Sequence, residues 1–217
     1  MMKARCDKFG VVMRSYLLAP KLKGYNLQVT CDVDDLEHDE VDNELIHSYM
    51  HHALQLSTVP PAFYVTVGFP QRFTRWQDAL VRIDGKTVVG AHGLKHVHYS
   101  TLTGFQANCE LEVCSRLSSS FRFPYLDVNM ELLKTVSNLF QVDSSVAVSG
   151  LYPYRIGKLT EYPVTMPSDN GFEDPKVAAE DYHAKIVDAQ SCRRHVTLLL
   201  HLNWFSVEIM KELEAII

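Results

Sequence analysis

The sequence predicts a single α+β domain formed by all 217 residues. Segments with helical periodicity alternate with short apolar segments that are typical of strands. No Gly/Ser-rich or proline-rich linker divides the chain, and one core is a usual arrangement at this length. Apolar residues make up 47% and charged residues 22% of the sequence, which is typical of a globular protein and argues against disorder.

The first half of the chain is predicted to contain two strands and two helices. Residues 26–33 alternate in polarity and suit a strand. Residues 41–54 suit a helix, because acidic residues precede apolar positions at helical spacing. Residues 63–67 follow two prolines that stop the helix, and they suit either a second strand or a buried extended segment. Residues 71–83 form a second helix, with large apolar side chains on one face.

The second half is predicted to begin with antiparallel strands, because apolar and β-branched runs are separated by turn residues. These runs cover residues 96–103, 109–117, 126–136 and 140–154. Residues 132–140 also fit a helical period, so a helix is the alternative there. The chain is predicted to end with a helix, a buried strand and an amphipathic helix, at residues 174–188, 195–203 and 206–217.

Charge and cysteine content limit the location and the partners. The net charge is -5, and Lys and Arg are scattered, so bulk binding of nucleic acid is not expected. The five cysteines lack C-x-x-C spacing, which favours reduced thiols over disulfides or a zinc site. No apolar run is long enough to cross a bilayer. A cytoplasmic protein without a cofactor or bound metal is therefore expected.

Three short sequence motifs resemble those of one enzyme family. Val59-Pro60-Pro61-Ala62-Phe63-Tyr64 is followed by Gly68-Phe69-Pro70 and then by Gly93-Leu94-Lys95-His96-Val97. This series is similar to the first unit of MaoC-like acyl-thioester dehydratases. The resemblance implies a hotdog-like fold over residues 13–158, in which an antiparallel sheet wraps the central helix at 71–83, with a helical extension at 159–217.

The resemblance also implies a function. An acyl-CoA or acyl carrier protein would bind in a tunnel lined by Pro61, Phe63, Phe69, Phe73 and Trp76. The family's catalytic Gly-Asp-x-Asn-Pro-x-His word is missing. A thioesterase-like or dehydratase-like activity would therefore rest on other groups, and the candidates are Asp78 on the central helix and His96 on the next strand. A non-catalytic accessory subunit is the alternative, and a homodimer would cover the open edge of the sheet.

A second hypothesis comes from two H-x-[ST] words, His98-x-Ser100 and His195-x-Thr197. This spacing resembles that of 2H phosphoesterases, in which two histidines act as acid and base on a cyclic or 2'-5' phosphodiester. Positions i and i+2 share one face of a strand, so each histidine would point the same way as its hydroxyl partner.

Two weaker patterns involve metal-binding spacing. His96-Val97-His98 with the Tyr182-x-x-Lys185 word resembles the set of rolling-circle endonucleases, although the acidic net charge argues against it. His47 and His51 lie one helical turn apart, a spacing that can bind zinc, but no H-E-x-x-H word is present. The sequence therefore indicates no complete metal site.

Overall fold

The computed structural model describes residues 26–34, 48–49, 52, 61–68, 88–148, 152–166 and 168–216. Its strands are β1 (Asn26–Val33), β2 (Ala62–Val65), β3 (Val89–Ala91), β4 (Ser120–Phe121), β5 (Val142–Asp143), β6 (Tyr154–Ile156), β7 (Leu159–Glu161) and β8 (His195–His201). Its long helices are α4 (Gly104–Leu117), α5 (Met130–Leu139), α6 (Pro175–Ser191) and α7 (Trp204–Ile216).

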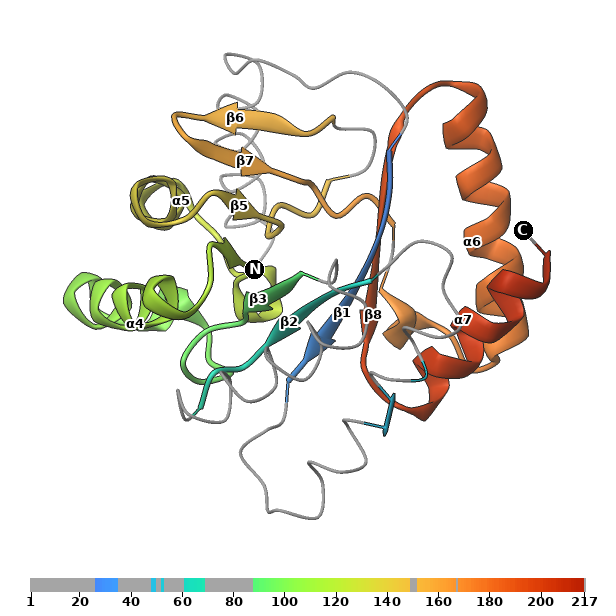
Figure 1. The fold of residues 1–217 in the computed structure, drawn as a ribbon, viewed down its shortest axis with the longest axis horizontal. Coiled ribbons are helices and arrows are strands. Elements are labelled where there is room, and N and C mark those ends of the chain that lie inside the picture. The colour runs from blue at the N-terminus through green and yellow to red at the C-terminus, as the bar shows by residue number, and fades with distance from the viewer. Residues whose placement is uncertain are drawn as a thin grey trace.

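The eight strands form one curled sheet in the order β6-β7-β5-β4-β3-β2-β1-β8 (Figure 1). Neighbouring strands run parallel except for β6 and β7, which are antiparallel. Figure 1 shows α4 and α5 beside one part of the sheet, and α6 and α7 beside β8. Because the strands are parallel, their carboxyl ends gather at one edge, where ligands of such sheets usually bind.

The longest pairing joins β1 to β8, from Asn26 beside His195 to Asp32 beside His201. All of β8 except His201 and the last five residues of β1 are buried, which is typical of parallel strands covered on both faces. The strands predicted at residues 26–33 and 195–203 are therefore confirmed. The helices predicted at the end of the chain are confirmed as α6 and α7.

Two of the predicted strands are helices instead. Thr103 accepts a hydrogen bond from the backbone of Gln106, whose side chain accepts one from the backbone of Thr103, and this capping box starts α4. Asn129 caps α5, where its side-chain oxygen accepts the backbone N–H groups of Glu131 and Leu132. The strands predicted at 109–117 and 126–136 are wrong, whereas the helical alternative at 132–140 is confirmed. Capping side chains outweighed β-propensity at both places.

The hotdog-like fold is therefore wrong. A hotdog sheet is antiparallel and wraps a central helix, whereas this sheet is largely parallel and has helices beside it. The supposed extension at 159–217 contributes β7 and β8 to the sheet itself. The expected central helix at 71–83 lies outside the described residues. The homodimer was inferred from the open edge of a hotdog sheet, so that reason disappears with the fold.

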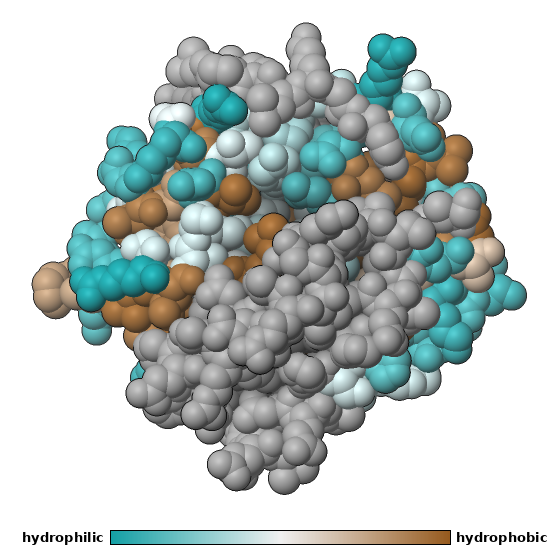
Figure 2. All heavy atoms as spheres, in the orientation of Figure 1, coloured by the Kyte–Doolittle hydropathy of each residue, from teal (hydrophilic) through white to brown (hydrophobic). Residues whose placement is uncertain are grey.

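The core is apolar and rich in aromatic rings. Phe121 packs edge-on against Phe123 and Tyr99, with ring centroids 4.9 and 6.1 Å away, and all three are buried. Such edge-to-face pairs add to the free energy gained by burial. On the face shown in Figure 2, hydrophobic residues are interspersed with hydrophilic ones. Among the described helices, none has the length and hydropathy needed to cross a membrane.

Candidate active site

A polar pocket of about 300 Å³ lies at the carboxyl edge of the sheet. Its walls include Asp32 and Asp34 from the end of β1, His201 from the end of β8, and His92 and His96 from the loop after β3. These residues are distant in the sequence but adjacent in space because β1, β3 and β8 all point the same way.

Asp34, His92 and His96 form a group that could hold a metal ion, since one ligand atom from each lies within 4.8 Å of the others. The Oδ1 atom of Asp34 is 3.3 Å from Nε2 of His92 and 3.4 Å from Nε2 of His96. That oxygen is buried and has no hydrogen-bond partner among the described residues. A divalent cation fits here, because two imidazoles and a carboxylate are common ligands of zinc and related metals.

Gly93 lets both histidines face Asp34. Its φ of +82° is in the left-handed region, and a Cβ there would lie 2.9 Å from the carbonyl oxygen of Lys95. A side chain at this position would therefore be strained and crowded. The turn at Gly93 brings His92 and His96 to the same side of the loop.

A backbone contact orients His92 for metal binding. Its Nδ1 lies 3.0 Å from the carbonyl oxygen of Arg122, so that nitrogen carries the proton and donates it. This tautomer leaves the lone pair on Nε2 directed at Asp34. Histidine ligands of metals are commonly oriented in this way. Burial opposes ionisation of Asp34, but the nearby imidazoles of His92, His96 and His201 lower the pKa of its carboxyl overall.

Asp32 is held by a fully buried guanidinium. Arg122 donates to Oδ1 of Asp32 at 2.7 Å and to the hydroxyl of Thr30 at 2.8 Å. It also donates to the carbonyl oxygen and the hydroxyl of Ser144, both at 2.7 Å, and lies over the ring of Tyr64. Hydrogen bonds from a guanidinium to a carboxylate are strong and fix the orientation of the carboxylate. The other oxygen of Asp32 lies 3.8 Å from Nε2 of His92, on the side of the metal group.

His201 is paired with a second buried carboxylate. Its Nδ1 lies 2.7 Å from Oδ1 of Asp169, and its backbone N–H donates to Oδ2 of the same residue at 2.8 Å. Burial disfavours the imidazolium, but the hydrogen bond and the charge of Asp169 outweigh it and raise the pKa of His201. Its Nε2 lies 3.8 Å from Oδ2 of Asp34. His201 is also the register partner of Asp32 on the neighbouring strand, so an acid candidate and a base candidate lie side by side at the pocket.

Tyr125 forms an aromatic rim above these groups. Its ring is 54% exposed, stacks on His98 at a centroid distance of 4.0 Å, and lies 4.4 Å from the ring of His96. Both Tyr125 and Leu126 have positive φ, at 57° and 50°. Backbone strain of this kind is concentrated at functional sites, where the surrounding structure maintains it.

The candidates from sequence are placed in three different regions. His96 is in the pocket, and His98 lies at its rim with Asp127 3.7 Å away, while Ser100 donates its backbone N–H to the same carboxylate. Pro61 and Phe63 are buried at the start of β2. The remaining candidates of the thioester hypothesis lie outside the described residues; they are Phe69, Phe73, Trp76 and Asp78.

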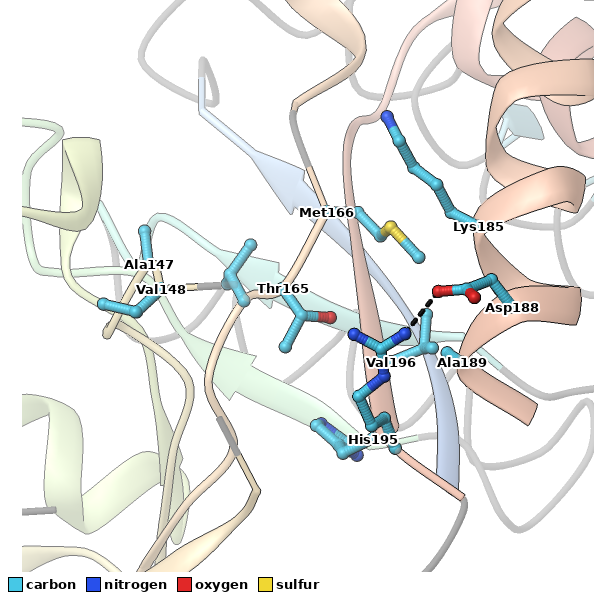
Figure 3. Close-up of a pocket in the computed structure, with 11 residues that line it drawn as sticks. Ala147, Val148, Thr165, Met166, Lys185, Asp188, Ala189, His195 and Val196 are labelled. Atoms are coloured by element: carbon cyan, nitrogen blue, oxygen red, sulfur yellow. Dashed lines mark hydrogen bonds and ion pairs between the residues drawn. The ribbon is translucent and has the colours of Figure 1, made fainter. Parts of the chain in front are cut away.

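His195 and Thr197 lie at the start of β8, whereas His201 ends it, so at 3.3 Å per residue they are about 20 Å and about 13 Å from His201 at the pocket. Nε2 of His195 is 2.6 Å from the hydroxyl of Thr197. Figure 3 shows His195 beside a separate pocket of about 370 Å³, with Lys185 and Asp188 of α6 on its far wall. The two H-x-[ST] words therefore do not face each other, and the phosphoesterase hypothesis is wrong.

The rolling-circle endonuclease pattern is also wrong. Tyr182 is fully buried and packs against Phe172, so it cannot act as an exposed nucleophile. Lys185, the other residue of this motif, forms an ion pair with Asp181. His47 and His51, which have the spacing of zinc ligands on the first predicted helix, both lie outside the described part of the chain.

Burial of His195 predicts acid sensitivity of the fold. Burial lowers its pKa to about 4, although the backbone of Asn26 opposes this shift, whereas the unfolded value is about 6.5. The unfolded chain therefore binds this proton first, and stability is lost as the pH falls from about 6.5 to about 4. The difference corresponds to as much as about 3 kcal/mol. Urea unfolding at about pH 7 and about pH 4.5 measures it.

The matched variant is His195→Asn, which removes the titrating ring. Between about pH 7 and about pH 4.5, both proteins lose free energy of unfolding. We expect the loss in the variant to be smaller than the loss in the unmodified protein by about 2–3 kcal/mol. The control, His183→Asn on α6, should lose as much stability as the unmodified protein does. An equal acid loss in all three proteins would contradict the role of His195.

The comparisons with known proteins are consistent with this geometry. No protein-family model matches the sequence, and no curated protein does either. A protein from Mycobacterium smegmatis described as a polysaccharide deacetylase has a TM-score of 0.68 and 18% identity, over 91% of this chain and 85% of that one. Puue allantoinase has a TM-score of 0.66 and 11% identity, over 89% and 84%.

A third solved structure is a peptidoglycan N-acetylglucosamine deacetylase in complex with an N-hydroxybenzamide. It has a TM-score of 0.54 and 12% identity, over 96% of this chain and 89% of that one. At these identities the likeness establishes the fold, which this chain shares with these hydrolases. It overturns the relation to MaoC-like dehydratases. Two further predictions are therefore also wrong. They are the acyl-CoA or acyl carrier protein partner and the role as an accessory subunit.

Proposed function

We propose that the chain is a divalent-metal-dependent hydrolase that removes acetyl groups from a carbohydrate. The observation that carries this proposal is the buried Oδ1 of Asp34, which lacks a hydrogen-bond partner in the described structure and faces the Nε2 atoms of His92 and His96. A cation would satisfy all three atoms at once. When bound, such an ion supplies Lewis-acid polarisation of the scissile carbonyl and makes a water molecule more acidic.

The flanking residues suit the two proton transfers of hydrolysis. Asp32, oriented by its hydrogen bond from Arg122, takes a proton from the attacking water as that water adds to the carbonyl carbon. His201, whose pKa is raised by Asp169, gives a proton to the departing nitrogen or oxygen as the bond to the acyl carbon breaks. The products are acetate and a free amine or alcohol, and both residues exchange their protons with solvent afterwards.

The substrate class follows from the fold and the rim. Two of the structures with this fold are described as a polysaccharide deacetylase and a peptidoglycan N-acetylglucosamine deacetylase. The half-exposed ring of Tyr125 at the mouth of the pocket offers a flat apolar surface of the kind on which a sugar ring can stack. An N-acetylated or O-acetylated saccharide is therefore the first substrate to test.

A second candidate is hydrolysis of a small cyclic amide. Puue allantoinase has nearly the same TM-score as the Mycobacterium smegmatis protein, 0.66 against 0.68. The pocket, at about 300 Å³, is at the lower end of the size range for small-molecule sites. The same base and acid would open a ring instead of releasing acetate.

A substrate panel separates the two candidates. Chelator-treated protein reloaded with Zn²⁺, Co²⁺ or Mn²⁺ is incubated with N-acetylated glucosamine oligomers, an acetylated xylan, or allantoin. Release of acetate that depends on the metal supports the deacetylase, and ring opening of allantoin alone supports the cyclic amidase. Inhibition by a simple hydroxamate would support metal at the site. Absence of turnover on every substrate with every metal would contradict both.

A further inference from the structure

Asp143 and Glu161 form a buried carboxyl pair outside the pocket. They end β5 and β7, and they are partners in the register of these parallel strands. Both side chains are fully buried. In the described part of the structure, no ion pair involves either residue, because the nearby Arg122 gives its N–H groups to Asp32, Thr30 and Ser144.

Each carboxyl has one oxygen with a donor and one without. Oδ1 of Asp143 accepts the hydroxyl proton of Ser145 at 2.8 Å, and Oε1 of Glu161 accepts the backbone N–H of Val146 at 3.0 Å. Oδ2 of Asp143 and Oε2 of Glu161 are shielded from water and receive no donor from the described protein. Asp143 and Glu161 are register partners on neighbouring strands, so the two carboxyl groups lie side by side in the interior. A proton on one of them would let it donate to the other, which two ionised carboxylates could not do.

We propose that Asp143 and Glu161 share a single proton and act together as positioning residues for the metal-binding His92. The proton resides on Glu161 and is donated to Asp143, which stays ionised. This arrangement gives every oxygen of the pair a partner and leaves one negative charge near Arg122 instead of two. Like charges this close in a buried site cannot both persist.

The electrostatic environment agrees with this assignment. Burial raises the pKa of both carboxyls, and the pKa of Glu161 is raised further by the charge of Asp143. Arg122 acts in the opposite direction on each of them. The charge of Asp143 also acts on Tyr64 of β2, whose pKa is raised to about 12, mainly by burial.

A chain of hydrogen bonds connects the pair to the pocket. Because ionised Asp143 takes the hydroxyl proton of Ser145, the lone pairs of that hydroxyl accept the backbone N–H of Phe123 at 2.9 Å. Phe123 follows Arg122, whose carbonyl oxygen orients Nδ1 of His92. Loss of the shared proton would leave two buried charges and disturb Ser145, and hence the peptide that holds His92.

The proton itself is tested without any substrate. Infrared spectra of the full-length protein near neutral pH should contain the C=O stretch of a protonated carboxyl group. That band should disappear in Glu161→Gln, whereas it should persist in the exposed control Glu112→Gln. A spectrum without this band in the unmodified protein, or a band that survives Glu161→Gln, would overturn the shared proton whatever the protein's activity.

The positioning role rests on the hydrolase function proposed above and needs a kinetic test. Glu161→Gln keeps a donor toward Asp143, so its kcat should stay within about twofold of the original. Glu161→Leu, which is close in size but has no donor, should lower kcat by about 10–100-fold, the usual effect of residues behind a metal ligand, with KM little changed. Equal kcat values for the two variants would overturn the role.

The infrared and kinetic experiments together distinguish failure of the proposed hydrolase function from failure of the shared-proton proposal. If the unmodified protein hydrolyses no substrate, the proposed function fails, while the infrared band still decides whether the proton is shared. If the protein is active and the band is present, but Leu and Gln behave alike, the pair is structural only. Thermal unfolding of both variants shows whether Leu simply destabilises the fold.

Discussion

The substitution Asp34→Asn is expected to lower kcat/KM by about three orders of magnitude and to abolish metal binding. Asp34 supplies the only carboxylate of the three-residue ligand group. An amide oxygen carries no charge with which to offset that of a divalent ion. Loss of a few kcal/mol of transition-state stabilisation corresponds to about 10³ in rate. The measurement is acetate release under subsaturating substrate, with the metal content of each protein determined in parallel.

The control for Asp34 is Asp181→Asn, which removes a carboxylate from the surface of α6. We expect it to retain full activity and full metal content. If Asp34→Asn kept both properties as well, the metal site would lie elsewhere. If it lost activity but kept its metal, the role of Asp34 would be a different one, and the assignment of the ligands would be wrong.

Replacing Arg122 with Met is expected to lower the free energy of unfolding by about 3–5 kcal/mol, the usual cost of breaking a buried ion pair. The change leaves Asp32 charged, buried and without its guanidinium partner. It also removes the donors to Thr30 and Ser144. Equilibrium unfolding in urea measures the loss, provided that the slope of the transition is unchanged.

The control for Arg122 is Arg116→Met on α4, where the side chain is exposed. Its free energy of unfolding should change by no more than about 0.5 kcal/mol, as for most surface substitutions. A loss below about 1 kcal/mol for Arg122→Met would contradict the proposed network, because it would mean that Asp32 does not depend on the guanidinium.

The parts of the fold predicted correctly are those whose local pattern allows one interpretation. The strand β8 reads Val-Thr-Leu-Leu-Leu after His195, an apolar run too short for a membrane span and rich enough for a buried strand. The helix α6 begins with Asp174 and Pro175, a common start signal. Neither pattern depends on the remainder of the fold.

The topology could not be read in the same way. Residues 109–117 contain Cys, Leu and Val in a run that suits either a strand or one face of a helix, and the capping box at Thr103 decides for the helix. Once α4 and α5 are taken for strands, the sheet seems antiparallel. The short words around Pro60 and Gly93 then resemble a hotdog unit, although Gly93-Leu94-Lys95-His96 is a loop beside the pocket.

The site was missed because its members are separated by long stretches of sequence. Asp32 and Asp34 read as the start of an acidic run, and His96 was paired with His98 instead of with His92. One signal was available in the sequence. Asp32 and Asp34 follow a buried strand, and the motif His92-x-x-x-His96 follows the second apolar segment after that strand. With parallel strands, both fall at the same edge. Arg122 and His201 gave no comparable local signal.

The central claim is that Asp34, His92 and His96 bind one divalent ion, and calorimetric titration of chelator-treated protein with Zn²⁺ tests it most directly. We predict saturable binding of one ion per chain, lost in Asp34→Asn and in His92→Gln but retained in Asp181→Asn. Absence of binding in the unmodified protein, or equal binding in Asp34→Asn, would contradict the account.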